Sequence, residues 1–511
     1  MNDQERTAAE DDKRQILNYM KTHRLEEVLN ELINELVKSR PEDPFLDLSQ
    51  TIESRSPIAN QIVRVNAREI MGSDGYPALE VEMETLRGIV RSIVAGVGPY
   101  DGDEERYGGK GVKDAVGVVL TVLGDKLIGK DPRRQDVIDE ILTDDPSYPT
   151  NAVLGLSICA CKAGAKFNEM EVYEHVATLG NISDPRIPMP WFNLFNGGLQ
   201  GNNEHHIESI SFSVPSAATL ADAVMEASKI YQTFPQSLTK LMTPPKAPNN
   251  GKIGGYSPQC ETMNDVLEAI KLTLIDLELA DKVNLSINMN SGVYSSQIET
   301  DEGDEEIAYQ YDVTHFAPED AVKDLKSSGE LMDEYFELMV AYPIVSIEDG
   351  FDKKDSTSLI ELREKVDAEV TRITEAGDEP NPFPENLGGS DGVVVQLVGN
   401  KMASTQEDLI RAEEKQTFNS FAISLSKAKT VSNFVALCAK ADSLGTPVLA
   451  VDEGEQSDNF LTHMAVGLRC SQVRAGGLLG GHVGKYNELL RLEEGEEGVP
   501  GVAIVGEAWR K

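Results

Sequence analysis

From about residue 191 onward the chain alternates between short apolar runs and longer amphipathic stretches such as "TVSNFVALCAKADSL". Apolar runs with the length of buried strands lie at 283–288, 343–348, 393–398, 420–425, 447–451 and 471–474. Repeated strand–helix units of this size predict parallel strands covered by helices. We therefore predict a (β/α) barrel over residues 191–511, interrupted by an acidic surface insertion at 299–306 and a Pro- and Gly-rich one at 375–392.

A different pattern precedes the barrel. The stretches "IVRVNAREIM", "SDGYPALEVEMET" and "RGIVRSIVAGV" read as three strands joined by turns. Helical patterns such as "GVKDAVGVVLTVLGDKLIG" follow them. Residues 57–190 are thus predicted to form an α+β domain.

Residues 1–56 form a third segment, which begins with a polar tail. Pro41 and Pro44 cannot continue a helix, so a first helix is predicted to end at "SRPEDP", and Phe45, Leu48 and Ile52 mark a second one. Two short helices cannot bury an apolar face alone, so this face must meet a second copy, a partner or the rest of the chain. The aliphatic residues on one face of the first helix are Leu25, Val28, Leu29, Leu32, Ile33, Leu36 and Val37.

Polar residues follow the predicted barrel strands. In a (β/α) barrel the carboxyl ends of the strands carry the function. The acids Glu348 and Asp349 at one such end indicate either metal or proton chemistry or an ordinary solvated strand end. The strand-end residues are Asn288, Glu348, Asn400, Ser424, the run Val451, Asp452 and Glu453, and Arg474.

Composition narrows the class of partner. The net charge of −39 disfavours nucleic acid and anionic membranes, since both reward basic patches. No apolar run reaches the roughly 18 residues of a membrane span, and the polar N-terminus does not resemble a secretory signal. Five cysteines without metal-type spacing favour a reducing compartment, and Cys159 and Cys161 fall in a predicted buried helix. We expect a cytoplasmic protein.

Several motifs from about residue 60 onward resemble those of the enolase family. "PIVSIEDGF" is similar to the family's strand-end motif "PIVSIEDPF", "SDGYPALEVEM" to "SRGNPTVEVE", and "LFNGG" to "LNGG". "AVGLRCSQVRAGG" followed by "GKYNELLRLEE" resembles the family signature and its C-terminal helix. The resemblance implies an α+β N-terminal domain, a barrel, a homodimer, and two magnesium ions that serve the conversion of 2-phosphoglycerate to phosphoenolpyruvate.

The residues at the family's metal positions differ from the family's own. The family holds its first magnesium with three carboxylates, and here Glu348 is retained while Asn288 and Asn400 stand at the other two positions. An amide offers a neutral oxygen, so two of the negative charges on which a hard divalent cation depends are missing. We expect no cofactor, and magnesium only if the chain is an active enolase.

The positions that catalyse the family's reaction differ as well. Ser424 stands in place of the lysine base, Ile253 in place of the acid of the family's "DEGG" motif, and Gln200 in place of the histidine after "NGG". Arg474 conservatively replaces a lysine. A serine cannot abstract a carbon-bound proton unaided, because enolase-type chemistry needs a Lys or His base together with metal.

The phosphate site implied by the resemblance is also altered. Val451, Asp452 and Glu453 replace the family's His, Arg and Ser. Like charges at about 4 Å cost roughly 1 to 4 kcal/mol each in a surface cleft, so the two carboxylates should repel a dianion. The family's mobile lid is shortened to "AGVGPYDG", without the serine that ligates the second magnesium.

Two alternative metal sites stay open at this point. A rebuilt site could use Asp452, Glu453, Glu455, Asp458 and Glu348, although acidic clusters are usually solvated surfaces. The "EHH" stretch at 204–206 offers two histidines, although adjacent side chains diverge on most backbones.

The N-terminal helices resemble the dimerisation/docking domain of cAMP-dependent kinase regulatory subunits. In that domain two chains form a four-helix bundle that receives an amphipathic helix from an anchoring partner. The resemblance implies a homodimer, an anchoring or axonemal protein as partner, and a cilium or flagellum as a location; the alternative is a hairpin packed on its own barrel. The implied docking residues are Leu25, Val28, Leu29, Leu32, Ile33 and Leu36.

Two functions follow. The first is a non-catalytic enolase-like structural or scaffold protein that dimerises or docks partners through its N-terminal helices. The alternative is an active, magnesium-dependent enolase of glycolysis, or a related lyase with an altered site.

Overall fold

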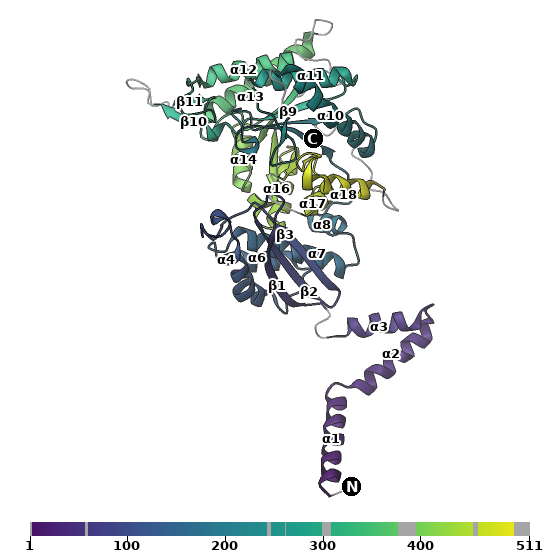
Figure 1. Cartoon of the computed structure of the whole chain (residues 1–511). Helices are drawn as coiled ribbons and strands as arrows, with labels where there is room; N and C mark the ends of the chain where they lie inside the picture. Colours follow the sequence, from purple (N-terminus) through teal and green to yellow (C-terminus); the bar gives the residue numbers. More distant parts are fainter. Residues whose placement is uncertain are drawn as a thin grey trace.

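The computed structural model describes residues 3–56, 60–242, 247–260, 262–298, 308–376, 395–452 and 458–494. Three parts follow one another along the chain in Figure 1: three N-terminal helices, a small α+β part and a larger α/β part. The predicted 299–306 insertion lies outside the described residues, as does most of the 375–392 insertion, of which only the first two residues end a helix.

The larger part is a closed barrel. Its strands, in sheet order, are β4 (Met189–Pro190), β17 (Gln472–Arg474), β16 (Val448–Val451), β15 (Ser420–Ser424), β14 (Gln396–Gly399), β13 (Ile344–Glu348), β9 (Asn284–Asn288), β6 (Ser209–Ser213) and β5 (Phe192–Asn196). The barrel closes because β4 pairs with β17 while β5, directly after it in the chain, pairs with β6. Between them the Trp191 amide donates to the Val473 carbonyl at 2.8 Å.

The six predicted barrel strands are confirmed, with residues 393 and 394 outside the described chain. They run parallel to one another, whereas β6 is antiparallel to both β5 and β9. Strands β5 and β6 were not predicted. Both strands are buried on both faces and carry polar residues inside, such as Asn193 and Ser211, so neither is an apolar run; the alternation of serine with Ile210 and Phe212 in β6 is the signal that could have marked it.

Helices cover the outside of the barrel. Three of them begin with a reciprocal capping box, at Thr262, Ser327 and Thr405, which satisfies free amides of the first turn. The barrel helices are α10 (Leu220–Leu241), α11 (Met263–Asp276), α12 (Ser328–Ala341), α13 (Ser356–Ala376), α14 (Gln406–Glu414), α15 (Leu425–Ala428), α16 (Val431–Ser443), α17 (Phe460–Gly467) and α18 (Val483–Glu494).

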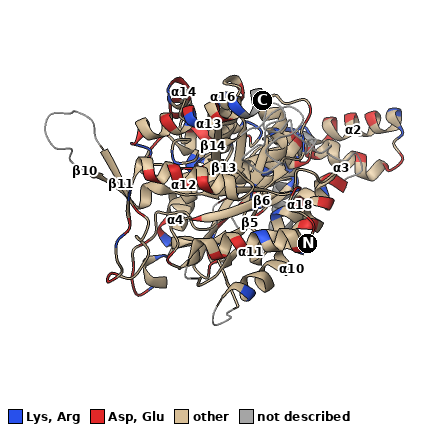
Figure 2. Cartoon of the chain, turned by 90° about the horizontal axis from the view of Figure 1, so that it is seen from above, with Lys and Arg blue, Asp and Glu red and all other residues tan. Residues whose placement is uncertain are grey.

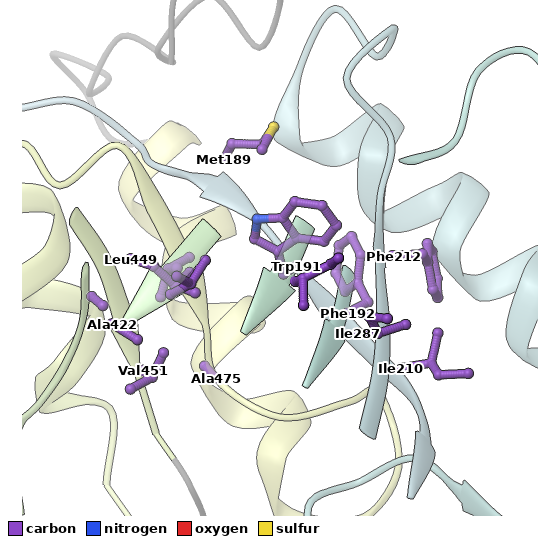
Figure 3. Packing of buried hydrophobic residues seen from close by; sticks show 14 of the residues in the cluster. Met189, Trp191, Phe192, Ile210, Phe212, Ile287, Ala422, Leu449, Val451 and Ala475 are labelled. Atoms are coloured by element: carbon purple, nitrogen blue, oxygen red, sulfur yellow. The ribbon is translucent and has the colours of Figure 1, made fainter. Parts of the chain in front are cut away.

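The barrel core is filled by large side chains from the first strands and smaller ones from the last strands. In Figure 3, Phe192 and Phe212 lie on one side of Trp191, and Ala422 and Leu449 lie on the other. Burial of this kind is worth about 25 cal/mol per Å² of apolar surface. The barrel therefore has a packed core, which fixes the strand ends.

The α+β part contains an antiparallel sheet of β1 (Ile62–Met71), β2 (Pro77–Thr85) and β3 (Gly88–Val94), as predicted. Helix α7 (Thr150–Phe167) packs on this sheet and buries Cys159 and Cys161, which confirms their predicted helix. The helical pattern at 111–129 forms α4 (Lys113–Val118), a π-helical turn (Val119–Leu123) and α5 (Gly124–Leu127). Helices α6 (Gln135–Leu142) and α8 (Val172–Gly180) complete this part.

The N-terminal helices are α1 (Asp3–Thr22), α2 (Leu25–Ser39) and α3 (Pro44–Ser54), and Figure 1 shows them apart from the barrel. The two predicted helices are confirmed, and the polar segment that precedes them forms a further helix, α1, which was not predicted. Within the described residues, no helix is long and apolar enough to cross a bilayer. Figure 2 shows Asp and Glu (red) over outer helices such as α2, α12 and α13.

Candidate functional site at the mouth of the barrel

The strand ends bring the predicted residues together at one mouth of the barrel. Glu348 ends β13 and lies in register with Asn288, which ends the neighbouring β9. Asn400 directly follows β14, and Arg474 ends β17. All four are buried, with exposed fractions of 0% for Glu348 and Asn400. Buried polar groups of this density need internal partners, and the structure supplies them.

The carboxylate of Glu348 is held by protein donors on both oxygens. Arg474 binds it in a bidentate manner, with Nη1 2.5 Å from Oε2 and Nη2 2.9 Å from Oε1. The Asn400 Nδ2 amide donates to Oε1 at 2.7 Å. Bidentate pairs between a guanidinium and a carboxylate are the strong members of their class, so this carboxylate is firmly engaged.

Asn400 joins Glu348 to a lysine that the sequence did not single out. The Lys427 ammonium donates to Asn400 Oδ1, and its nitrogen lies 3.4 Å from the Asn400 carbonyl oxygen. Lys427 belongs to α15, one turn after Ser424. The hydroxyl of Ser424 accepts from the Lys427 amide at 3.4 Å and lies 3.0 Å from the Ser426 hydroxyl. Ser424 therefore begins a helix, and its side chain is used for capping.

Glu208 is a second residue that the sequence reading missed. It directly precedes β6, and its carboxylate accepts from Asn288 Nδ2 at 3.0 Å and from Asn290 Nδ2 at 2.9 Å. Because β6 is antiparallel to β9, its first residue lies beside the last residue of β9. Recognising β6 as an antiparallel strand, from its alternation of serine with Ile210 and Phe212, would have placed Glu208 at the mouth.

Asp349 lies directly behind Glu348 in a left-handed conformation, with φ 46°. Its Oδ1 accepts from the Asn400 amide at 2.9 Å and its Oδ2 from the Lys401 amide at 3.2 Å. Burial, and next the charge of Glu348, raise the pKa of Asp349 to about 7. The adjacent acids Glu348 and Asp349 are therefore neither solvated nor convergent, because Glu348 faces Arg474 and Asp349 faces backbone amides.

Among the other predicted site residues, Gln200, Ile253 and Asp452 line one small central cavity of about 60 Å³. Its walls include Gln200, Glu208, Ile253, Asp452 and Arg474. Asp452 forms a buried ion pair with Lys485 of α18. Val451 instead packs in the barrel core (Figure 3), and Glu453 lies outside the described residues.

Family models match both parts of the chain after the N-terminal helices. The N-terminal domain of enolase matches residues 62–176, and the C-terminal TIM barrel domain of enolase matches residues 185–379 and 384–501. The chain belongs to the enolase family. Relatives include cytosolic enolase 3 of Arabidopsis thaliana, which is 27% identical over 96% of this chain and 98% of its own length. The enolases of Mastigamoeba balamuthi and Eimeria tenella are 30% and 29% identical over 85% and 86% of this chain, and over 95% and 96% of their own lengths.

The oxygens of Asn288, Glu348 and Asn400, the positions that the resemblance assigns to the metal, do not fit a magnesium ion. Each of these oxygens accepts a hydrogen bond from the protein. Arg474 and Asn400 Nδ2 donate to Glu348, and Lys427 donates to Asn400 Oδ1. The backbone amide of Asn290 donates to Asn288 Oδ1 at 3.1 Å. A divalent cation needs carboxylate and carbonyl oxygens that converge on an empty point. Here an ammonium and a guanidinium already supply the positive charge.

The described members of the two alternative metal sites do not come together, and Glu453 and Glu455 of the first site lie outside the described residues. Asp458 pairs with Lys162 of α7 at 2.8 Å. His205 packs against the edge of Phe195, whereas His206 turns to Glu334 of α12 at 3.6 Å, so the two rings diverge. Over the described parts of the chain, no group of three or more His, Cys, Asp or Glu side chains is arranged to hold a metal ion.

Proposed function

We propose that this enolase-family chain is a non-catalytic scaffold that dimerises and docks partners through its N-terminal helices. The observation that carries the first half of this proposal is the bidentate contact of Arg474 with Glu348. It engages the one acid retained at the family's metal position. An enolase uses this carboxylate to bind its cation, whereas here the Arg474 guanidinium binds it.

The residues at the family's acid and base positions support the same conclusion. Ile253 has no ionisable group, and the Ser424 hydroxyl caps α15. Lys427 is the nearest lysine to Ser424 along the chain, but its ammonium is bound to Asn400 and it does not line the central cavity. A general base must reach the proton it removes, so none of these groups is placed for the family's first step.

The hairpin of α2 and α3 supports the second half of the proposal. Asp43 caps α3 by accepting from the Phe45 and Leu46 amides, both at 3.0 Å, and Pro44 opens that helix. Arg55 at its end pairs with Glu31 and Glu35 of α2, at 3.2 and 3.0 Å. The two helices are thus held side by side within one chain.

One apolar face of this hairpin is left uncovered. Leu32 is buried, but Leu29 and Ile33 are 46% and 49% exposed. Phe45 and Leu46 add to the exposed surface, at 83% and 56%. Pairing with the same face of a second copy would bury these side chains and leave a shallow groove for a partner's amphipathic helix. A cytoplasmic location, in an axoneme or elsewhere, is part of this proposal.

The decisive experiment is an assay of 2-phosphoglycerate dehydration with saturating magnesium. The scaffold proposal expects no turnover, because loss of one general acid or base already lowers rates by about 10²- to 10⁴-fold. A rate within tenfold of an ordinary enzyme's roughly 10 s⁻¹ would overturn it and favour the alternative, an active enolase with an altered site.

A further inference from the structure

The C-terminal half of helix α1 is amphipathic, and its apolar side is uncovered. Met20 lies four residues after Ile16 and three after Leu17, so the three side chains share one face of the helix. Their exposed fractions are 38%, 54% and 50%. Figure 1 shows α1 extending away from α2 and α3, so the hairpin of the same chain does not cover this face.

Lysines flank this apolar side at both ends. Lys13 and Lys21 lie eight residues apart on the same face of α1, and both are exposed. Residues 13–24 carry four Lys and Arg and no Asp or Glu, whereas the first 12 residues contain five acids and one Arg. The charge therefore changes sign within α1. We call the side that combines cations with apolar residues the basic face; it consists of Lys13, Ile16, Leu17, Met20 and Lys21.

The hairpin of α2 and α3 carries the opposite charge beside an uncovered apolar face of its own. Residues 25–54 contain eight Asp and Glu against two Lys and Arg. Glu26 and Glu42, one at either end of α2, are exposed, and neither takes part in an ion pair within the described part of the chain. Glu26 lies three residues before the exposed Leu29, so an acid and an apolar side chain share one face. The hairpin and the basic face are thus complementary in charge, which selects and orients a partner.

The hairpin alone is small for a stable interface. Helices α2 and α3 have 15 and 11 residues, and only one side of each can face a partner. Stable interfaces engage about 20 to 30 residues on each side. A second element must therefore add to the contact, and α1 is the neighbouring element with matching chemistry.

We propose that the basic face of α1 binds the α2–α3 hairpin of a second copy. This inference rests on the proposed dimerisation through the N-terminal helices, and it names the segment that completes the contact. Reciprocal exchange of α1 between two copies gives a closed two-fold dimer, in which neither hairpin is left to recruit a third chain. An amphipathic helix from another protein must then compete with α1.

An anionic membrane is the other surface that a basic amphipathic helix can bind. The net charge of −39 and the five acids at the start of the chain disfavour it, because both repel anionic lipid. The acidic hairpin lies in every copy of the chain, at the same concentration as α1. The second copy is therefore the occupant that the charges favour.

Zero-length crosslinking of the full chain tests this proposal, because a carbodiimide joins a lysine amine only to a carboxylate in direct contact. Unlabelled and heavy-nitrogen-labelled copies are unfolded and refolded together in equal amounts. Mass spectrometry then separates contacts between copies, which join one light and one heavy peptide, from contacts within one copy. We expect mixed crosslinks from Lys13 or Lys21 to acids of residues 25–54.

Two pairs of substitutions show whether the basic face makes this contact. Ile16→Asp with Met20→Asp should lower the yield of mixed crosslinks at least about tenfold, because charges replace two apolar side chains and both lysines remain. The matched control is Gln15→Asp with Asn18→Asp, which adds the same charge to the opposite side of α1 and should leave the yield unchanged. An equal loss in both variants would overturn the proposal.

Two further results would also overturn it. Crosslinks between α1 and the hairpin that join only peptides of the same label would show α1 bound to its own chain. Binding to phosphatidylserine vesicles without any mixed crosslink would assign the basic face to a membrane.

Hairpin pairing is measured separately, by excimer fluorescence of a pyrene label on Lys38→Cys. An excimer without mixed crosslinks from α1 would refute the role of α1 and leave dimerisation of the hairpins standing. Absence of both signals would refute the proposed dimerisation as well. Failure of this inference is thus distinguishable from failure of the proposed function.

Discussion

Arg474 and Glu348 form a tether across the mouth of the barrel. They end β17 and β13, which are separated in the sheet by β14, β15 and β16, and yet their side chains meet in two hydrogen bonds of 2.5 and 2.9 Å. Both side chains are shielded from water, at 5% and 0% exposure. The contact therefore joins strand ends that backbone pairing does not connect.

This tether makes a prediction about stability. Glu348→Gln removes the carboxylate that Arg474 chelates, and breaking a buried pair on one side typically costs about 3–5 kcal/mol. The double variant Glu348→Gln with Arg474→Met should recover part of that loss. Urea unfolding measures the free energy of unfolding of both variants. The control is Asp184→Asn, which breaks a half-exposed ion pair with Arg469 and should lower the free energy of unfolding by less than about 1 kcal/mol. A Glu348→Gln variant with an unchanged free energy of unfolding would contradict the tether.

Magnesium gives a second prediction. Millimolar magnesium should not stabilise the wild-type chain, because donors occupy the oxygens of Glu348 and Asn400. In the double variant Asn288→Asp with Asn400→Asp, added carboxylates beside Glu348 should lower stability without metal and create a magnesium-dependent rise in melting temperature. Saturation at a hundredfold excess over Kd would add about 2.7 kcal/mol. A saturable shift in the wild type that Glu348→Gln abolishes would show that the metal site is intact.

The exposed hairpin face gives a third prediction. Leu29→Asp with Ile33→Asp should separate the hairpins of two copies, because it places charges in the proposed contact. A pyrene label on Lys38→Cys should report their pairing by excimer fluorescence, since the native cysteines are buried or partly buried. The matched control is Asn30→Asp with Asn34→Asp, which adds the same charge at neighbouring exposed positions. An excimer that is absent from the wild type, or that survives in the Leu29 and Ile33 variant, would refute hairpin dimerisation.

Asp349 gives a fourth prediction, on pH. Its folded-state pKa of about 7 lies above the roughly 3.9 of an unfolded aspartate, so the folded chain binds the extra proton between these values. The contribution of Asp349 to the free energy of unfolding must then fall as pH rises from about 4 to about 7, and stay at its lowest above that. Asp349→Asn should flatten this trend when urea midpoints at about pH 5 and about pH 8 are compared. Parallel pH profiles of wild type and variant would contradict it.

The sequence predicted the barrel because strands such as β13 and β16 are short, mostly apolar runs between amphipathic helices. It predicted the convergence of Asn288, Glu348 and Arg474 because parallel strands end at one mouth. It did not reveal Glu208 or Lys427. Glu208 directly precedes a strand that is buried on both faces and contains no apolar run, and Lys427 reaches Asn400 only through the turn of α15. Nor could it show that the Glu348 oxygens are already bound, since that depends on side-chain geometry across the barrel.

The pairing of charges at the mouth also bears on how this site can change. Glu348 is matched by Arg474 and Asp452 by Lys485, so each of these two buried acids is balanced by a cation on another strand or helix. Replacing one member of either pair leaves the other buried with less compensation. A substitution at Glu348, Arg474, Asp452 or Lys485 is therefore best tolerated when its partner changes with it.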